Sequence, residues 1–270
     1  MKIYDCFLYN DENEILEIRL NTLNNFVDKF IIVESKVNHQ GKLKKINFNL
    51  DKFSKFKDKI LYFLIDEYKG EYTYWEIENY QRNYILNGLK NCQNDDVIII
   101  SDLDEIPNLE KFDFDNMQKK IYVFEQDFFM YKLNLERKKK WHGTKLCKFK
   151  DLKSLQWLRS LKTKKKYPFW RIDKIFDNNY NKNFEVVKNG GWHFSWLKSV
   201  ENIILKLDSY VHKEFNNELF NTKKYILNCI KNKINFLDPQ EKLEVKNINF
   251  SFPKYVLNNK NLFSEWIEKV

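Results

Sequence analysis

The sequence predicts an α/β fold with a mostly parallel sheet, flanking helices and a helical C-terminal part. Over residues 1–107, apolar runs of strand length alternate with segments of helical periodicity, which indicates right-handed βαβ units. Residues 97–100 are four consecutive β-branched side chains, a pattern typical of a strand buried on both faces. The predicted strands also end in acidic or polar residues, and such ends share one edge of a parallel sheet.

The individual elements follow from hydrophobic periodicity. We expect strands at residues 2–8, 30–33, 59–65 and 97–100, with helices at 12–25 and 75–89 between them. Pro107 is expected to end extended structure, because proline cannot donate to a sheet ladder. The remaining elements expected are strands at 120–131, 141–149 and 184–187, a turn at 189–191, and helices at 151–161, 198–211, 217–232 and near 261–269. We interpret residues 1–215 as the main domain and residues 216–270 as a helical extension packed on it.

The positive charge of the chain does not by itself predict a partner. The formal net charge is +9, but only five of the 47 basic residues are arginine, and lysine excess is what an AT-rich coding sequence produces. We therefore predict no nucleic-acid partner. Residues 137–140 and 162–166 are dense in positive charge. A solvated surface is the favoured interpretation, which leaves peripheral association with lipid headgroups open.

The cysteines and the N-terminus predict a cytoplasmic protein. Cys6, Cys92, Cys147 and Cys229 are widely spaced and form no paired motif, so neither a zinc ribbon nor a disulfide framework is expected. The first residues enter a strand at once and leave no room for a signal peptide. No apolar run approaches the roughly 20 residues that a membrane span needs.

Acidic residues at the predicted strand ends are the main site signal. Asp102, Asp104 and Glu105 directly follow the buried strand, and carboxylates that close together repel one another unless a cation or donor-rich ligand lies among them. Mg²⁺ or Mn²⁺ suits such oxygen ligands and commonly bridges to phosphate. Glu34 and Asp66 end two other strands at the same edge. The pattern predicts a metal–nucleotide site there.

Three further groups of residues are candidates for that site. Arg82 lies on the helix before the Asp-x-Asp strand, where its planar fork suits phosphate, although a surface arginine is about equally expected. His193 follows Gly190 and Gly191, and glycines permit close backbone approach to a ligand. A hydrogen-bonded core histidine is the alternative. The Trp-His-Gly-Thr run at 141–144 suits stacking on a sugar or base.

The general base is not resolved by the sequence. Asp127, Asp173 and Glu185 are carboxylates in the less regular middle of the chain, and each has the chemistry to deprotonate a hydroxyl group. Their spacing does not distinguish among them.

Several motifs together resemble glycosyltransferase family 17, which includes transferases that add N-acetylglucosamine (GlcNAc) to N-glycans. The similar segments are residues 4–7, 13–14, 16–20, 27–35, 81–83, 101–107 and 190–195, in order over roughly residues 1–215. The resemblance implies a GT-A type, Rossmann-like fold, a nucleotide-sugar donor and inversion at the anomeric carbon. It is specific for the family and weak for the substrate.

The resemblance also implies roles for individual residues. Asp104 would coordinate the metal on the diphosphate, and Asp102 would lie near the ribose. Glu34 would lie by the nucleoside, Arg82 and Asn83 would approach the uracil or diphosphate, and His193 would complete the metal shell.

We therefore expect a glycosyltransferase that depends on Mn²⁺ or Mg²⁺ and uses a UDP-sugar, with UDP-GlcNAc favoured. The expected acceptor is a cell-surface or viral glycan, or a lipid-linked oligosaccharide. Two other classes stay open: a metal-dependent phosphohydrolase or nucleotidyltransferase using the same acidic edge, and a non-enzymatic module that binds carbohydrate or nucleic acid. Release of phosphate without sugar transfer would favour the first, and salt-sensitive oligonucleotide binding without UDP binding would favour the second.

Overall fold

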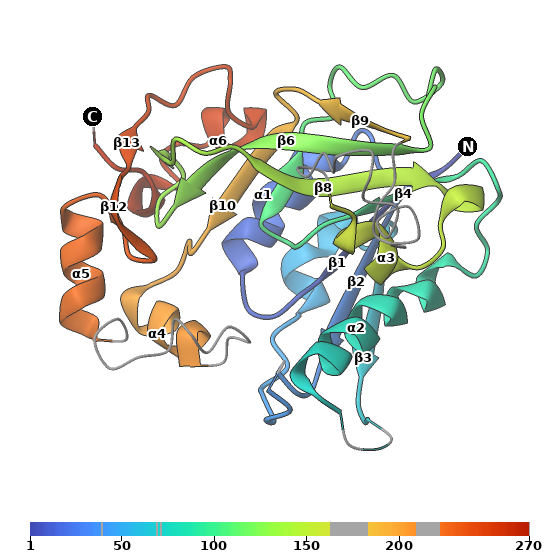
Figure 1. Ribbon diagram of the computed structural model, residues 1–270, viewed down its shortest axis with the longest axis horizontal. Coiled ribbons are helices and arrows are strands. Elements are labelled where there is room, and N and C mark those ends of the chain that lie inside the picture. Colours follow the sequence, from blue (N-terminus) through green and yellow to red (C-terminus); the bar gives the residue numbers. More distant parts are fainter. Residues whose placement is uncertain (39, 69, 71, 163–182, 209–221, 270) are drawn as a thin grey trace, which may run out of the picture.

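The computed structural model describes residues 1–38, 40–68, 70, 72–162, 183–208 and 222–269. Its centre is a mixed sheet whose first part is parallel, in the strand order β3-β2-β1-β4 (Figure 1). The four strands are β1 (Ile3–Leu8), β2 (Lys29–Ser35), β3 (Ile60–Ile65) and β4 (Val97–Ile100). All three pairings among them are parallel, as the alternation of strands and helices predicted.

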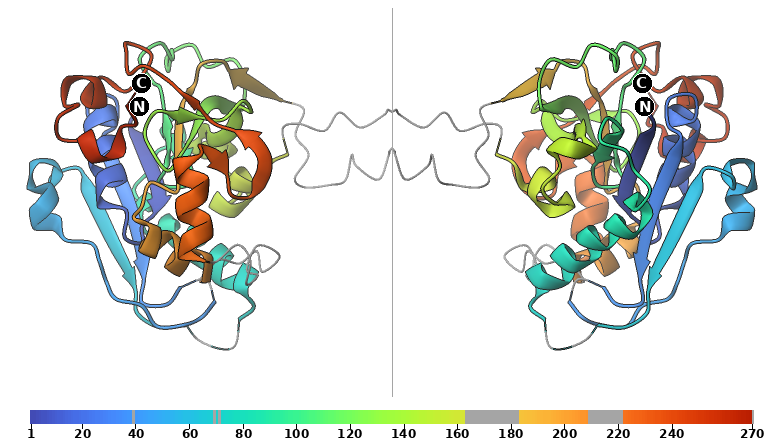
Figure 2. Two further views of the ribbon diagram at one scale, coloured as in Figure 1. Left: turned by 90° about the vertical axis from the view of Figure 1, so that its left-hand side faces the viewer. Right: turned by 90° about the vertical axis from the view of Figure 1, so that its right-hand side faces the viewer.

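Helices cover both faces of the parallel strands (Figure 2). Helix α1 (Asn13–Leu23) connects β1 to β2, and α2 (Tyr74–Tyr84) continues into the 3-10 helix η2 (Ile85–Leu89) before β4. Because successive strand residues point to opposite faces, Phe7 and Ile99 pack with α1, whereas Cys6 and Ile98 pack with η2. Helix α2 begins at a capping box, in which Thr73 and Glu76 each accept a hydrogen bond from the other's backbone N–H.

The second part of the sheet is largely antiparallel and is organised around one long strand, β6 (Ile121–Met130). On one side β6 pairs with β8 (Trp141–Lys148), which joins it to β4, and both pairings are antiparallel. On its other side β6 pairs in parallel with β9 (Phe184–Val187) and then with β10 (Gly191–Ser195). Further short strands are β5 (Glu105–Pro107), β7 (Leu135–Glu136) and β13 (Glu244–Val245).

Extended structure ends at Pro107 as expected, but it does so in a short strand that the sequence did not predict. Residues 105–107 form β5, which pairs antiparallel with β10. Proline is tolerated because it is the last residue of a three-residue strand, where a missing N–H removes little of the ladder.

The C-terminal part is less helical than expected. Helix α4 (Val200–Asp208) and α5 (Lys223–Lys231) lie within predicted helices, and their apolar faces share a core cluster with Phe128, Met130 and Trp196. Between α5 and α6 (Lys254–Asn258), however, the chain forms β11 (Ile234–Asn235), β12 (Asp238–Lys242) and β13, which extends the main sheet beside β7. Near the predicted terminal helix there is a 3-10 turn, Ser264–Trp266. None of the helices in the described part of the chain is both long and apolar enough to cross a membrane.

Candidate functional site

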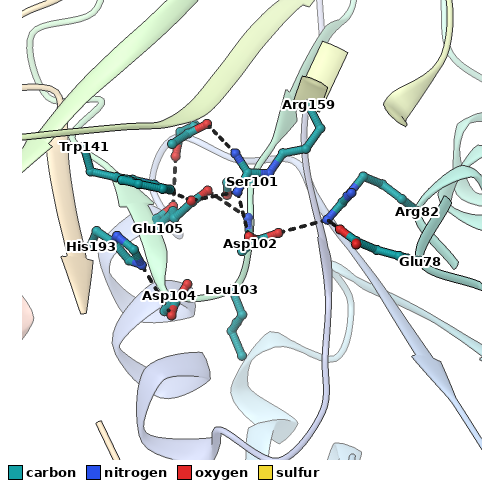
Figure 3. A network of polar contacts seen from close by, with 12 residues as sticks. Glu78, Arg82, Ser101, Asp102, Leu103, Asp104, Glu105, Trp141, Arg159 and His193 are labelled. Carbon is teal, nitrogen blue, oxygen red and sulfur yellow. Dashed lines mark hydrogen bonds and ion pairs between the residues drawn. The ribbon is translucent and has the colours of Figure 1, made fainter. Parts of the chain in front are cut away.

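The loop that follows β4, residues 101–105, forms the floor of the candidate site (Figure 3). It lines a pocket of about 440 Å³ at the carboxyl ends of β1, β2 and β4. One wall of the pocket comes from the loops after β1 and β2 and from α2. A second wall comes from β6, β8, β10, α4 and the segments beside them. This edge of the sheet is where open α/β folds bind ligands.

A buried arginine fixes the shape of the floor loop. Arg19, on α1, is fully buried and forms a two-point ion pair with Asp5, with N–O distances of 2.6 and 2.8 Å. Its Nη1 donates to the backbone carbonyls of residues 102, 103 and 105, each at 3.0 Å, and its Nη2 donates to the Ser101 hydroxyl at 2.7 Å. One guanidinium therefore satisfies the carbonyls of residues 102 and 103, which have no regular secondary structure, and that of Glu105 at the start of β5.

Asp102 is held between two arginines. Its Oδ2 accepts a hydrogen bond from Arg159 Nη2 at 2.6 Å, and its Oδ1 lies 3.2 Å from Arg82 Nη2. Burial acts to raise the pKa of Asp102, but the guanidinium groups of Arg159 and Arg82 outweigh it and hold that pKa well below its usual range. Arg82 also pairs with Glu78 (Figure 3). Its Nη1 donates to the Gln156 side chain at 2.5 Å. Asp102 is thus ionised and already paired.

Glu105 is a structural centre of the site. It is 1% exposed, and its Oε1 accepts from the Trp141 indole at 2.6 Å and from Arg159 at 2.9 Å. Its Oε2 accepts from the backbone N–H of Asp102 at 3.0 Å. Gly143 is needed beside this carboxylate, because a Cβ there would lie 2.6 Å from Glu105 Cδ. Glu105 therefore fixes both the loop and the indole that lines the pocket.

Asp104 and His193 form the remaining polar pair on the floor. Asp104 Oδ2 lies 3.5 Å from His193 Nε2, and the two side chains point toward each other (Figure 3). The imidazole is stacked on Phe128, with ring centroids 4.2 Å apart, and lies beside Trp141. Its Nδ1 is buried and has no hydrogen-bond partner among the described residues. The polar edge that the ring offers is therefore the one facing Asp104.

This pair fits a metal ion that is shared with a substrate. No group of three or more His, Cys, Asp or Glu side chains in the described ranges could hold a metal alone. Mg²⁺ and similar ions, however, often bind one or two protein ligands and complete their shell with phosphate oxygens and water. A carboxylate oxygen and an imidazole nitrogen at one position supply such a partial shell. Asp102 is unsuited to the same role because two guanidinium groups already neutralise it.

The other predicted donor-binding residues lie in three different environments. Glu34 is buried and accepts four hydrogen bonds, from Lys44, Tyr62 and the backbone N–H groups of residues 47 and 48. Asn83 accepts from the backbone of Gln156 and so joins α2 to α3 (Leu155–Ser160). Asp66 pairs with Lys36 at the surface. None of the three is a lining residue of the pocket.

Neither Asp127 nor Glu185, two of the three predicted bases, lines the pocket with Asp104. Asp127 pairs with Lys140, and Glu185 is exposed on β9 opposite the beginning of β6. Asp173 lies outside the described residues. Besides those of the floor loop, the carboxylates of the described residues that line the pocket are Glu12 and Glu78. The general base stays unassigned.

Sequence reasoning missed Arg19, Arg159 and Glu105 as organisers of the site, and one signal pointed to the two arginines. The chain has only five arginines, and Arg19, Arg82 and Arg159 all contact the loop at 101–105. In a chain where most cations are lysine, these three arginines lie where several acceptors need the planar fork. Trp141 lines the pocket, and its stacking on a sugar or base stays a prediction.

The chain is similar to one protein family and to several characterised transferases. The model of glycosyltransferase family 17 matches residues 1–248. The β-1,4-mannosyl-glycoprotein 4-β-N-acetylglucosaminyltransferases of Rattus norvegicus and Homo sapiens are each 24% identical over 246 residues. Each match covers 79% of this chain and 44% of the relative, so the chain spans less than half the length of these curated relatives. Among solved structures, HddC from Yersinia pseudotuberculosis complexed with GMP-PN matches at a TM-score of 0.38 and 12% identity, covering 70% of this chain and 90% of that one.

Proposed function

Because the chain belongs to glycosyltransferase family 17, we propose that it transfers a sugar from a nucleotide-sugar donor to a glycan acceptor in the pocket around Asp104. The observation that carries the proposal is that the two aspartates of the floor loop have different partners. Asp102 is committed to Arg82 and Arg159, whereas Asp104 faces the pocket with His193 as its neighbour. One carboxylate organises the site, and the other is available to a cation on the donor.

The proposed metal is Mn²⁺ or Mg²⁺, held by Asp104 and His193. When bound, it would neutralise the charge that develops on the leaving diphosphate. The residues of the chain would hold and orient the groups that bind the metal and the donor. Arg19 and Glu105 hold the loop in shape, and Phe128 keeps the imidazole facing Asp104. Since these groups are in place before substrate binds, little reorganisation is needed at the moment of reaction.

The proposed donor is UDP-GlcNAc, with inversion at the anomeric carbon. The names of the relatives support GlcNAc as the sugar and a mannosyl glycoprotein as one kind of acceptor. The wall formed by Ser35, Asn38, Gln81 and Arg82 presents amides, a hydroxyl and a guanidinium, which are suited to a nucleoside and its phosphates. For this chain we propose a cell-surface or viral glycan as acceptor.

A transfer assay tests the proposal. The protein is incubated with UDP-GlcNAc, UDP-glucose or GDP-mannose and a mannosyl oligosaccharide, with Mn²⁺, Mg²⁺ or a chelator, and UDP release and product mass are measured. We expect an extended oligosaccharide only with UDP-GlcNAc and metal. Asp104→Asn should abolish it, and Asp95→Asn, which removes an exposed carboxylate paired with Lys148 and Lys150, should not. Release of inorganic phosphate without any extended product would instead support a phosphohydrolase.

A further inference from the structure

The second wall of the pocket has a chemistry of its own. Its side chains include the aromatic rings of Phe128, Trp141 and Trp196 and the cations Arg137 and Lys206. Aromatic faces of this kind suit the apolar faces of sugar rings, and a few well-placed polar groups then decide which sugar binds. Arg137 is the cation whose position is best defined.

Arg137 is held in place on two sides and leaves a third available. Its Nε and Nη2 both donate to Glu241 Oε2, at 3.0 and 2.6 Å, and its guanidinium carbon lies 4.4 Å from the centroid of the Phe128 ring. Its side chain is 15% exposed. Nη1 donates to no atom of the described residues, so one edge of the fork is preorganised without a protein acceptor. A guanidinium fixed in this way is suited to two-point binding of a carboxylate or phosphate.

Near Arg137 the wall contains a second cation, which is paired with a carboxylate. The ammonium of Lys206, on α4, lies 5.3 Å from the centroid of the Trp196 ring, and both residues line the pocket. Burial acts to raise the pKa of Glu12, but Lys206 and Lys198 outweigh it and lower that pKa to about 2. Lys206 is paired with Glu12, so an anionic ligand would depend on Arg137, whose Nη1 has no acceptor among the described residues.

We propose that this wall is an acceptor subsite for a sugar that carries a carboxylate or a phosphate, and that Arg137 binds the anionic group. The proposal rests on the proposed function, since it names the class of acceptor for the same pocket. It assigns recognition to a residue outside the floor loop. The Arg137–Glu241 pair orients the fork, and the Nη1 edge meets the ligand.

Binding of simple sugars tests the subsite without knowledge of the natural acceptor. Dissociation constants are measured by calorimetric titration for methyl β-glucuronide, glucose 1-phosphate and neutral methyl β-glucoside, with UDP and Mn²⁺ saturating so that the donor site is filled. We expect at least one anionic sugar to bind about tenfold or more tightly than the neutral one, the factor that one charged hydrogen-bonded pair supplies. Preference for the glucuronide would identify an acidic sugar, and preference for the phosphate would identify a sugar phosphate.

Variants connect any preference to Arg137. Arg137→Gln should abolish the discrimination, and Arg137→Lys should reduce it. If loss of the partner of Glu241 unfolds the protein, Arg137→Gln combined with Glu241→Gln removes the pair together. Lys188→Gln, which removes an exposed lysine paired with Glu125, is the matched control and should keep the full preference. Equal binding of all three sugars by the unmodified protein, or an unchanged preference in both Arg137→Gln variants, would overturn the proposal. The melting temperature with UDP is measured on the same samples, so failure of the donor site is recorded separately.

Discussion

At the scale of single residues, two aspartates one residue apart have different roles because their neighbours differ. The Asp102 side chain is 46% exposed, yet two guanidinium groups hold it ionised and paired. Asp104 is 18% exposed, and among the described residues its close polar side-chain neighbour is the imidazole of His193, with Nε2 3.5 Å from Oδ2. The motif predicted a metal site, but its division into an organising and a ligand-facing carboxylate depends on Arg159, which is 57 residues away in sequence.

Replacement of Arg82 by lysine tests the importance of the planar fork. Arg82 donates to Gln156 through Nη1 and pairs with Asp102 and Glu78 through Nη2. A lysine keeps the charge but cannot span these partners. We expect Arg82→Lys to weaken UDP binding by about tenfold, the effect of one charged hydrogen bond, as measured by calorimetric titration with Mn²⁺ present. An unchanged dissociation constant for UDP would show that Arg82 has only a structural role, in joining α2 to α3.

At the scale of elements, the pairing of β5 with β10 sets the distance between Asp104 and His193. Register places His193 opposite Glu105 and Gly191 opposite Pro107, and the Phe194 N–H donates to the Asp104 carbonyl at 2.9 Å. Gly191 has φ +131°, and a Cβ there would lie 2.1 Å from the Ile106 carbonyl oxygen. From the sequence, the paired glycines were expected to permit close backbone approach to a ligand. The structure shows that Gly191 is required for the approach of β10 to β5.

Gly191→Ala should therefore disturb the site through the sheet. We expect β10 to shift away from β5, which would move His193 from Asp104 and raise the Mn²⁺ concentration needed for UDP binding. Gly41→Ala is a useful comparison, because Gly41 also has a positive φ of 75° but its Cβ would have an ordinary 3.5 Å contact with Ile77. That variant should lose some stability to backbone strain and keep the metal dependence. If Gly191→Ala retained the Mn²⁺ dependence of the unmodified protein, the role of the β5–β10 pairing would be excluded.

Helix α3 is anchored to β8 by a buried lysine whose titration can be measured. Lys145 donates to the carbonyls of residues 159 and 161 at the end of α3. Burial, with a contribution from the nearby Arg159, lowers the pKa of Lys145 to about 7. Between pH 7 and the ordinary lysine pKa, the unfolded chain binds a proton that the folded protein does not, so this residue makes stability rise with pH.

The pH dependence of unfolding tests this assignment. The free energy of unfolding should increase between pH 7 and pH 8.5 in the unmodified protein, and the increase should be smaller in Lys145→Met. Denaturant unfolding at a series of pH values measures both. Parallel pH profiles for the two proteins would contradict a lowered pKa at Lys145.

The elements that the sequence predicted best are those with a strong local pattern. The predictions of strands β1 to β4 rest on apolar runs and those of helices α1 and α2 on apolar residues at helical spacing, and the structure confirms these elements. The two-residue strands β11 and β13 have no period to detect, and they form only because β12 and β7 lie beside them. The same limit applies to the site. In the sequence, nothing distinguishes Arg19 from other polar residues of a helix. Its role depends on the fold, which places three loop carbonyls beside its guanidinium.

At the scale of the whole molecule, the pocket exists because two differently built parts of the sheet meet at one edge. The parallel part supplies the floor loop and the wall with Arg82, and the part around β6 supplies His193, Trp141 and Arg137. Ion pairs also connect the two parts. Lys198, just before α4, and Lys206, on α4, both pair with Glu12, which follows β1. The C-terminal segment is tied in by Asn134, which exchanges hydrogen bonds with residues 246 and 268.

The central claim is that Asp104 and His193 bind a divalent cation together with the diphosphate of the donor. The most direct test is the melting temperature with UDP alone, with Mn²⁺ alone and with both. A ligand that binds only the folded state at about 100 times its dissociation constant adds about 2.7 kcal/mol of stability. We predict a rise in melting temperature with UDP and Mn²⁺ together, no rise in Asp104→Asn under the same conditions, and a normal rise in Asp95→Asn. A full rise in Asp104→Asn, or an equal rise with UDP when a chelator removes the metal, would contradict the claim.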